Sequence, residues 1–410
     1  MLSREDNDLL TRVDAGTPLG ELFRRYWIPA LLSEEIAEPD CPPVRVRLLG
    51  EDLVAFRASD GKIGLLGEHC AHRGTSLFFG RNEECGLRCI YHGWKFDTDG
   101  NVLDTPAEPA GSQLKNKVKH TAYPCREAGG IVFTYMGPRE TMPLLPNYPW
   151  LGVPAAQRYI AKSYLECNYL QGLEGDCDSA HLNFLHKMFK PDARREFLHL
   201  TDRAPDFEFD ELDCGVRAAA MRTLADGASY ARISHFIMPF IGAVPVGSMV
   251  DNRLDGFKAV YQVPSDSVNT WRYDFFFKWS RPFSQTDSSK RDFVDAGYKK
   301  LRNKRNNYLQ DRQLQKSVNF SGITEFLNQD ACATESMGAV VDRGKEHVGA
   351  SDAFILQVRR FLLRAVKDVQ AGKPAPGAIF VAEHNDMSHL RFEAAQLPAN
   401  VSWRSLYEKP

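Results

Sequence analysis

The sequence predicts an α+β fold, with a sheet-rich first part and a second part that combines strands with long helical segments. Its 410 residues suffice for two domains of ordinary size, and 43% hydrophobic with 25% charged residues is the balance of a globular protein. Segments 45–59 and 62–70 have the pattern of short strands divided by Gly or Asp turns, whereas 353–369 has the pattern of a long helix.

Further strands are expected along the chain. Segment 93–104, GWKFDTDGNVLD, predicts a strand, an Asp-Gly turn and a second strand, and the sheet around it would project two loops. In the second part, 256–263 and the aromatic-rich segment 270–283 predict strands. The polar run 284–292 predicts a loop, and no internal repeat or low-complexity segment is present.

The charge balance argues against polyanionic partners. With 51 basic and 53 acidic residues the formal net charge is -2, so no nucleic-acid or anionic-membrane footprint stands out. The N-terminal residues are charged where a signal peptide needs an apolar core, and the most apolar run, 236–250, is short and contains Pro239 and Pro245. These features predict a cytoplasmic protein that acts on a small molecule, without nucleic acid or membrane.

The clearest chemical signal is a set of two cysteines and two histidines in EHCAHRGTSLFFGRNEECGLRCIYHGW. Cys70-x-His72 is followed, after sixteen residues, by Cys89-x-x-His92. A zinc finger usually places two cysteines in one knuckle and two histidines on a helix, whereas each pair here holds one of each. The alternative to a metal site is a pair of core cysteines with two surface histidines.

Mixed pairs suit a Rieske-type [2Fe-2S] cluster, in which Cys70 and Cys89 hold one iron while His72 and His92 hold the other. Neutral imidazoles in place of two thiolates reduce the negative charge of the cluster and raise its reduction potential. Cys85, between the pairs, completes no Cys/His pair and is expected to be structural. The nine cysteines follow no regular framework, which favours metal ligands or buried thiols over disulfides.

A second group of candidate ligands lies in 168–189, NYLQGLEGDCDSAHLNFLHKMF. The segment has no proline, and its apolar residues recur at roughly helical spacing, which predicts a helix. On a helix, Glu174, Asp178 and His181 would form one stripe about two turns long. His186 would lie about 140° around the helix from His181, so both could bind one metal only if the helix were bent or bulged. We therefore expect an irregularity there.

Two histidines and one carboxylate form the facial triad of non-haem Fe(II) oxygenases, which leaves coordination positions open for dioxygen. Asp178 is a possible third ligand by its proximity to His181. Taken alone, histidines and acidic residues on a helix also suit a solvated face, so the residues leave both interpretations open.

The two groups together resemble the terminal oxygenase (alpha) subunits of Rieske non-haem iron aromatic ring-hydroxylating oxygenases, in their phthalate dioxygenase-like group. The spacing C-x-H-x16-C-x2-H followed by GWKFDTDG is similar to their Rieske domain, and NYLQGLEGDCDSAHLNFLH, QDACATESMG and DRGKEHVGASD are similar to their catalytic domain. The resemblance implies an all-β Rieske domain with an N-terminal helix over 1–150. It also implies a helix-grip catalytic domain, an antiparallel sheet around a long helix, over 151–410.

The resemblance also implies roles for the residues of D-x2-H-x4-H. His181 and His186 would bind the mononuclear Fe(II), and Asp178 would bridge to a Rieske histidine of a neighbouring subunit. Electrons would enter at the cluster and reach this iron across the bridge. A carboxylate suits the bridge because it can accept hydrogen bonds from two imidazole N–H groups at once.

The third iron ligand would lie far downstream, in FLNQDACATESMG at 326–338. Asp330 is the preferred residue in this segment. Glu335 and Asp352 are the runners-up, although Asp352 has the position of an N-cap for the helix 353–369.

The implied partners are an aromatic acid, O2 and a separate NAD(P)H-dependent reductase. No G-x-G-x-x-G stretch follows a strand, so the chain shows no flavin or nicotinamide signature of its own. The family arrangement implies a homotrimer or a dimer of trimers. Five arginines fall where a substrate pocket is expected: Arg203, Arg222, Arg232, Arg253 and Arg272.

The expected activity is hydroxylation of an aromatic carboxylate, as by a phthalate 4,5-dioxygenase, in aromatic catabolism. The run 236–250 carries no basic residue, which leaves phthalate itself in doubt and suits an apolar wall for an aromatic ring. Oxidative O-demethylation of a methoxylated aromatic acid is an alternative. An iron-sulfur electron carrier or redox sensor is an alternative of another class, and it would need no second, open iron.

Overall fold

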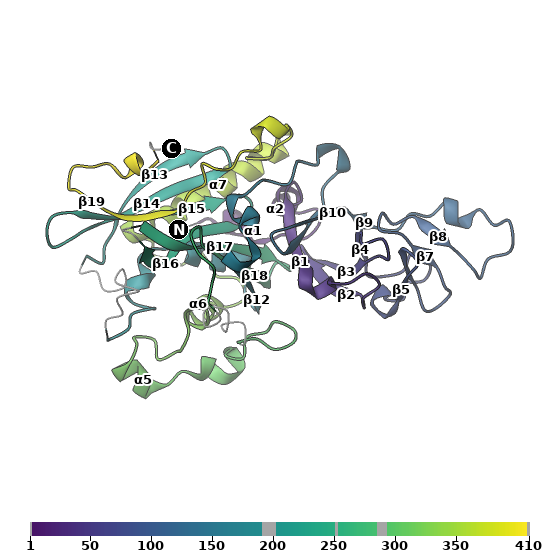
Figure 1. Cartoon of the computed structure of the whole chain (residues 1–410), viewed down its shortest axis with the longest axis horizontal. Helices are drawn as coiled ribbons and strands as arrows, with labels where there is room; N and C mark the ends of the chain where they lie inside the picture. The colour runs from purple at the N-terminus through teal and green to yellow at the C-terminus, as the bar shows by residue number, and fades with distance from the viewer. Residues whose placement is uncertain (1, 191–201, 251–252, 285–292, 408–410) are drawn as a thin grey trace. The chain divides into compact units, whose positions relative to one another are not determined.

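The computed structural model describes residues 2–190, 202–250, 253–284 and 293–407 (Figure 1). Its contacts divide the chain into two compact units. One unit is Val13–Leu145, and the other joins Met1–Arg12 to Pro146–Pro410.

The N-terminal helix α1 (Arg4–Thr11) belongs to the second unit, whereas the sequence analysis placed it in the first domain. The side-chain amide of Asn7 donates to the carbonyl of Val341 at 3.2 Å, and the hydroxyl of Tyr169 donates to the carbonyl of Leu10 at 3.0 Å. These partners are far away in the sequence, so local pattern gives no sign of them.

The first unit is built from short antiparallel strands, as expected. Its helix is α2 (Pro18–Phe23). The three sheets have the orders β1 (Trp27–Leu32)-β11 (Ile131–Tyr135)-β10 (Cys125–Ala128), β2 (Val44–Leu48)-β3 (Glu51–Arg57)-β4 (Ile63–Gly67)-β9 (Ala122–Tyr123), and β5 (Arg81–Glu83)-β6 (Gly86–Arg88)-β7 (Lys95–Phe96)-β8 (Val102–Asp104). The predicted hairpin of 93–104 is confirmed, because Lys95 pairs with Asp104 and Phe96 with Val102.

The second unit holds one antiparallel sheet of eight strands. The order along it is β12 (Arg158–Leu165), β18 (Thr270–Phe277), β17 (Arg253–Pro264), β16 (Ile241–Val250), β15 (Ser229–Ile237), β14 (Gly215–Thr223) and β13 (Asp206–Leu212), with β19 (Glu393–Leu397) paired to β15. The strand expected at 256–263 is confirmed as β17, and the strand expected at 270–283 is confirmed as β18 but ends earlier, at Phe277. The predicted loop 284–292 lies almost wholly outside the described residues.

Helices accompany this sheet, as the expected α+β catalytic domain requires. They are α3 (Tyr169–Cys177), α5 (Arg312–Ser317), α6 (Phe326–Glu335) and α7 (Ala353–Gln370). Helix α7 lies against the sheet near β14 and β15, where Phe361 packs on Phe236 with ring centroids 5.9 Å apart (Figure 1). Asp352 stands at the N-cap of α7, as predicted. Within the described ranges, no helix is long and apolar enough to cross a membrane.

The single helix predicted over 168–189 is wrong in its extent. Helix α3 ends at Cys177, and Asp178 is its C-cap with an extended backbone (φ -79°, ψ 122°). The Asp178 carboxylate accepts the backbone N–H of Ala180 at 2.6 Å, a local turn that competes with helix continuation. A separate 3-10 turn, η7 (His181–Asn183), follows. The expected stripe from Glu174 to His181 therefore does not form.

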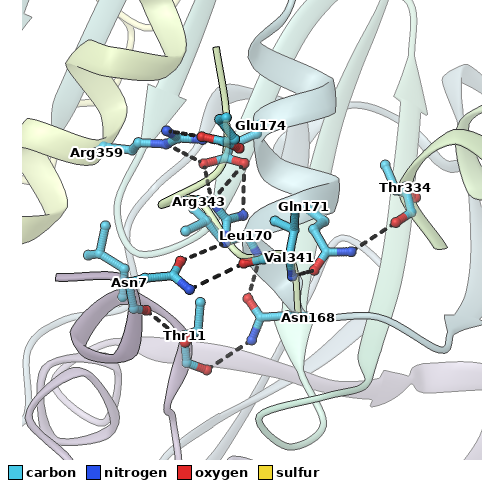
Figure 2. Close-up of polar contacts among 12 residues, drawn as sticks. Asn7, Thr11, Asn168, Leu170, Gln171, Glu174, Thr334, Val341, Arg343 and Arg359 are labelled. Carbon is cyan, nitrogen blue, oxygen red and sulfur yellow. Dashed lines mark hydrogen bonds and ion pairs between the residues drawn. The ribbon is translucent and has the colours of Figure 1, made fainter. Parts of the chain in front are cut away.

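A buried carboxylate fixes α3 to its surroundings (Figure 2). Glu174 accepts hydrogen bonds from Arg343 at 2.8 Å and from Arg359 of α7 at 2.7 Å. Arg343 also donates to Asn7 of α1 at 3.3 Å. Burial alone would raise the pKa of Glu174, but the charges of Arg343 and Arg359 outweigh it and hold the pKa below its usual value. Glu174 therefore joins α3 to α7 by charge and to α1 through Arg343, and it does not face the histidines.

Replacing Glu174 with Gln should lower the free energy of unfolding of the second unit by roughly 3 kcal/mol, because two buried guanidinium groups lose a shared counter-charge. Chemical denaturation followed by tryptophan fluorescence measures the loss. The folded pKa of Glu174 is depressed, so the stabilisation is complete above about pH 4.5 and disappears as the pH falls through the lower folded value.

Glu211→Gln is the matched control. Glu211 pairs with Arg364 at 2.7 Å, but both side chains are more than half exposed, so its loss should cost less than about 1 kcal/mol. Equal effects of the two substitutions would contradict the special role of Glu174.

Candidate metal centres

The two Cys/His pairs lie on two tight loops of the first unit. In the first loop, the N–H of Cys70 donates to the carbonyl of Thr75 at 2.9 Å and the N–H of Gly74 donates back to Cys70 at 2.8 Å. In the second loop, the N–H of Cys89 donates to the carbonyl of Trp94 at 2.8 Å. Backbone hydrogen bonds therefore hold both cysteines in place.

The side chains of these loops converge. Cys70 and Cys89 are buried in one apolar cluster with Trp94, while the rings of His72 and His92 lie 4.6 Å apart. The ring of His72 stacks on Trp94 at 4.8 Å with an interplanar angle of 3°. The structure thus brings together all four residues that the sequence analysis selected.

The donor set fits an iron-sulfur cluster. Burial and the neighbouring Cys89 raise the pKa of the Cys70 thiol to about 11, so the thiolate needs a compensating positive charge. Iron would supply this charge. Cys85 is exposed and has a positive φ of 59°, in the turn between β5 and β6. Its predicted structural role stays a prediction.

The second candidate centre lies in the second unit. The nearest ligand atoms of His181, His186 and Asp330 all lie within 4.8 Å of one another. Nε2 of His186 and Oδ1 of Asp330 are 2.9 Å apart, and the two imidazole rings are 5.1 Å apart at 70°. Two imidazoles and one carboxylate in such a group suit a facial triad for Fe(II).

The break after α3 makes this convergence possible. His181 begins the turn η7, and His186 follows beyond it with a buried side chain that stacks on Phe326 of α6 at 4.2 Å. The expected irregularity near the histidines is therefore present. The helix ends before His181, and it does not continue through a kink. Asp330 comes from α6, 144 residues after His186 in the sequence.

Asp178 lies behind His181. Its Oδ2 is 3.3 Å from Nδ1 of His181. Burial would raise the pKa of Asp178, but the hydrogen bond and charge of His181 outweigh it and hold the pKa low. Burial would likewise lower the pKa of His181, but Asp178 outweighs it and raises the pKa. His181 thus favours the ionised form of Asp178, and Asp178 favours the protonated form of His181.

Asp330 is held by charge from the sheet. Arg272 of β18 is 3.6 Å from its Oδ2 and also pairs with Asp176 at 3.2 Å and Asp274 at 2.8 Å. Burial would raise the pKa of Asp330, but His186 and Arg272 hold it well below its usual value. The carboxylate is therefore ionised and ready to bind a cation.

The runner-up carboxylates serve other contacts. Glu335 accepts the hydroxyl of Tyr308 at 2.6 Å and the N–H of Glu166 at 2.7 Å. Asp352 accepts the N–H of Gly349 at 2.7 Å beside α7. Neither residue is in the group that includes His181, which leaves Asp330 as the carboxylate there.

The five candidate arginines have different surroundings. Arg272 is committed to carboxylates, and Arg203 is exposed with its guanidinium 5.8 Å from the ring of Phe184. The side chain of Arg253 lies outside the described residues. Arg222 and Arg232 are both buried in neighbouring strands β14 and β15. The sequence spacing alone could not separate these cases.

Two residues of the site were missed by the sequence analysis. Gln329, next to Asp330, lies 2.6 Å from Nδ1 of His186, and Phe326 stacks on the same ring. Phe326 lies three residues before Gln329 and four residues before Asp330, and this spacing is the signal that could have found them, because positions i, i+3 and i+4 share a helix face.

Residues 26–124 match the Rieske [2Fe-2S] domain family, and residues 134–409 match the family described as LigXa C-terminal domain like. The chain is 40% identical to the phthalate 4,5-dioxygenase oxygenase subunit of Pseudomonas putida, over 98% of this chain and 94% of that protein. The chain belongs to the Rieske oxygenases. Its identity to the 3-chlorobenzoate-3,4-dioxygenase oxygenase subunit of Comamonas testosteroni is 35%, over 100% and 98% of the two chains.

Solved structures agree on the fold of this Rieske oxygenase. Pseudomonas putida CBB5 NdmA with caffeine matches with a TM-score of 0.66 and 20% identity, over 88% of this chain and 97% of that one. At this identity the likeness shows the fold alone. The alternative of an electron carrier or sensor is not supported, because the relatives that span nearly the whole chain are named as oxygenase subunits.

Replacing His181 with Ala should remove one iron per chain and leave the cluster in place, because the two centres use different ligands. Iron and acid-labile sulfide analysis should fall from three irons and two sulfides to two irons and two sulfides. The low-temperature electron paramagnetic resonance signal of the dithionite-reduced cluster should persist. His384→Ala, at an exposed position, is the control and should keep all three irons.

Proposed function

We propose that this Rieske oxygenase hydroxylates an aromatic carboxylate with O2 and with electrons from a separate reductase. The observation that carries the proposal is the group of two imidazoles and one carboxylate in the second unit. The proposed cluster ligands are Cys70, His72, Cys89 and His92, and the proposed Fe(II) ligands are His181, His186 and Asp330. When bound, the cluster would supply electrons and the iron would supply open positions for dioxygen.

Asp178 is proposed to act through hydrogen bonds. Its contact with Nδ1 of His181 favours the tautomer that leaves Nε2 free for a metal. The same carboxylate can accept a second imidazole N–H, which we assign to a Rieske histidine of a neighbouring subunit. His72 and His92 suit that role because both are partly exposed. A homotrimer or a dimer of trimers would supply such neighbours.

The reductase is proposed to meet this chain in the cytoplasm. All nine cysteines are free in the structure, and Cys70 and Cys89 must stay reduced to bind iron. An NAD(P)H-dependent reductase suits the absence of a nucleotide-binding fingerprint in the sequence.

The sheet face beside η7 supports an anionic substrate. Ala218, Ala220 and Arg222 alternate along β14, and Arg232 of β15 pairs with Ala220, so these side chains share one face of the sheet. The two arginines supply positive charge there. Phe236 of β15, four residues after Arg232, lies on the same face, where Phe361 of α7 packs against it.

Arg222 is the proposed substrate contact. It donates to Ser179 and to Asn183, both neutral, and its Nε finds no partner in the described part of the chain. Burial and the nearby charge of Arg232 lower the pKa of Arg222. A buried guanidinium is stabilised by an anion, so an aromatic carboxylate bound here would supply the missing charge beside the histidine loop.

O-demethylation is the second candidate. The chain is 32% identical, over 91% of its length and 82% of the relative, to the 5,5'-dehydrodivanillate O-demethylase oxygenase subunit of Sphingobium sp.. Release of formaldehyde from a methoxybenzoate would distinguish this activity from ring hydroxylation, which releases none.

Replacing Asp178 with Asn should leave the iron and sulfide content unchanged and largely abolish turnover, because the amide nitrogen is a donor and one of the two imidazole N–H groups would face it in place of an acceptor oxygen. Product formation with the reductase, measured beside the metal content, tests this. Near-normal turnover in Asp178→Asn would remove the bridge from the proposal.

Replacing Arg222 with Met should reduce kcat/KM for an aromatic carboxylate by about 10- to 100-fold, the range for a lost hydrogen bond to a charged group. The neutral amide of the same acid should be affected much less. Arg203→Met, at an exposed arginine near the same loop, is the control. Equal losses for acid and amide would mean that Arg222 only supports the loop.

A further inference from the structure

The side chain of His186 receives three contacts from one helix. Phe326, Gln329 and Asp330 of α6 occupy positions i, i+3 and i+4, which share one face of the helix. Phe326 stacks on the imidazole, Gln329 meets Nδ1 at 2.6 Å, and Asp330 meets Nε2 at 2.9 Å. The plane and both nitrogens of the ring are therefore set by α6.

The orientation of the Gln329 amide follows from its second hydrogen bond. Its Nε2 donates to the carbonyl of Ile323 at 2.7 Å, so Oε1 is the atom that faces His186. An amide oxygen only accepts, so Nδ1 of His186 carries a proton. Nε2, which lies 2.9 Å from the Asp330 carboxylate, is then the ring nitrogen at which a metal can take the place of a proton.

We propose that Gln329 is a positioning residue that fixes the tautomer and orientation of His186 for metal binding. The proposal rests on the assignment of His186 as an Fe(II) ligand. Gln329 is buried together with His186, so water does not offer an easy substitute for its carbonyl oxygen. Outer partners of ligating histidines typically contribute 10- to 100-fold to metal affinity.

The two histidines differ in what lies behind them. Nδ1 of His181 faces the carboxylate of Asp178, whereas Nδ1 of His186 faces a neutral amide. Arg272 already serves Asp330, Asp176 and Asp274, so a carboxylate at position 329 would add a charge that this arginine cannot also balance. A neutral acceptor fixes the ring without that cost.

The test is Co²⁺ titration of protein from which the mononuclear iron, but not the cluster, has been removed, followed by the visible difference spectrum of bound Co²⁺. Gln329→Leu keeps the side-chain size, removes the acceptor and should weaken Co²⁺ binding by about 10- to 100-fold with altered bands. Gln329→Glu restores an acceptor and should recover most of the affinity, because the bound dication offsets the added charge.

Gln171→Leu is the matched control. Gln171 of α3 is also a buried glutamine, and its amide donates to the carbonyl of Thr334 (Figure 2). The same amide donates to the carbonyl of Gly338, so both bonds point away from His186. It should bind Co²⁺ as the wild type does. Wild-type binding by Gln329→Leu, or equal weakening by Gln171→Leu and Gln329→Leu, would overturn the proposal, as would failure of Gln329→Glu to recover affinity.

His186→Ala separates this proposal from the metal site itself. If His186→Ala binds Co²⁺ as tightly as the wild type, the assignment of His186 as a ligand fails, and the role of Gln329 fails with it. If His186→Ala loses binding and Gln329→Leu does not, only the positioning role is overturned. The cluster signal of each variant confirms that the protein is intact.

Discussion

The buried carboxylate of Glu174 is the interaction on which the second unit depends. It ties α3 to Arg343 and to Arg359 of α7, and through Arg343 to Asn7 of α1 (Figure 2). One turn later, α3 ends at Cys177 with Asp178 as its C-cap, so Glu174 anchors the last turn before the histidine loop. Burying a charge this deeply costs free energy unless the charge is paired. The network therefore restricts the geometry of the helices more than it adds to the net stability of the fold.

A second charge network supports the candidate iron site. Arg272 lies between Asp176 of α3, Asp274 of its own strand and Asp330 of α6, and Lys258 adds a contact to Asp274 at 3.2 Å. Burial would lower the pKa of Arg272, but the carboxylates outweigh it and raise the pKa, so the guanidinium stays charged. The sheet thus supplies the positive charge that keeps Asp330 ionised before a metal arrives.

The ligand residues could be predicted from the sequence more accurately than the path of the backbone around them. Residue type and spacing were enough to select Cys70, His72, Cys89 and His92, because each pair lies on one short loop. The prediction of one helix over 168–189 was wrong because the Asp178 carboxylate accepts the backbone N–H of Ala180, which favours a turn over a further helical turn. The spacing of apolar residues gives no sign of that hydrogen bond. Gln329 was not selected, since its partner His186 lies 143 residues away and only its place on the helix of Asp330 could have indicated it.

The broken helix also explains why the two histidines can share one metal. On a continuous helix, residues five apart point about 140° from each other, so one of the two would face away. Ending α3 at Cys177 frees the backbone between His181 and His186 to turn, but it also removes the helix hydrogen bonds that would hold their side chains. Asp178 and Gln329 replace that lost restraint, one behind each ring. The irregular backbone brings the two imidazoles together, and the hydrogen bonds of Asp178 and Gln329 orient them. Neither feature positions the ligands without the other.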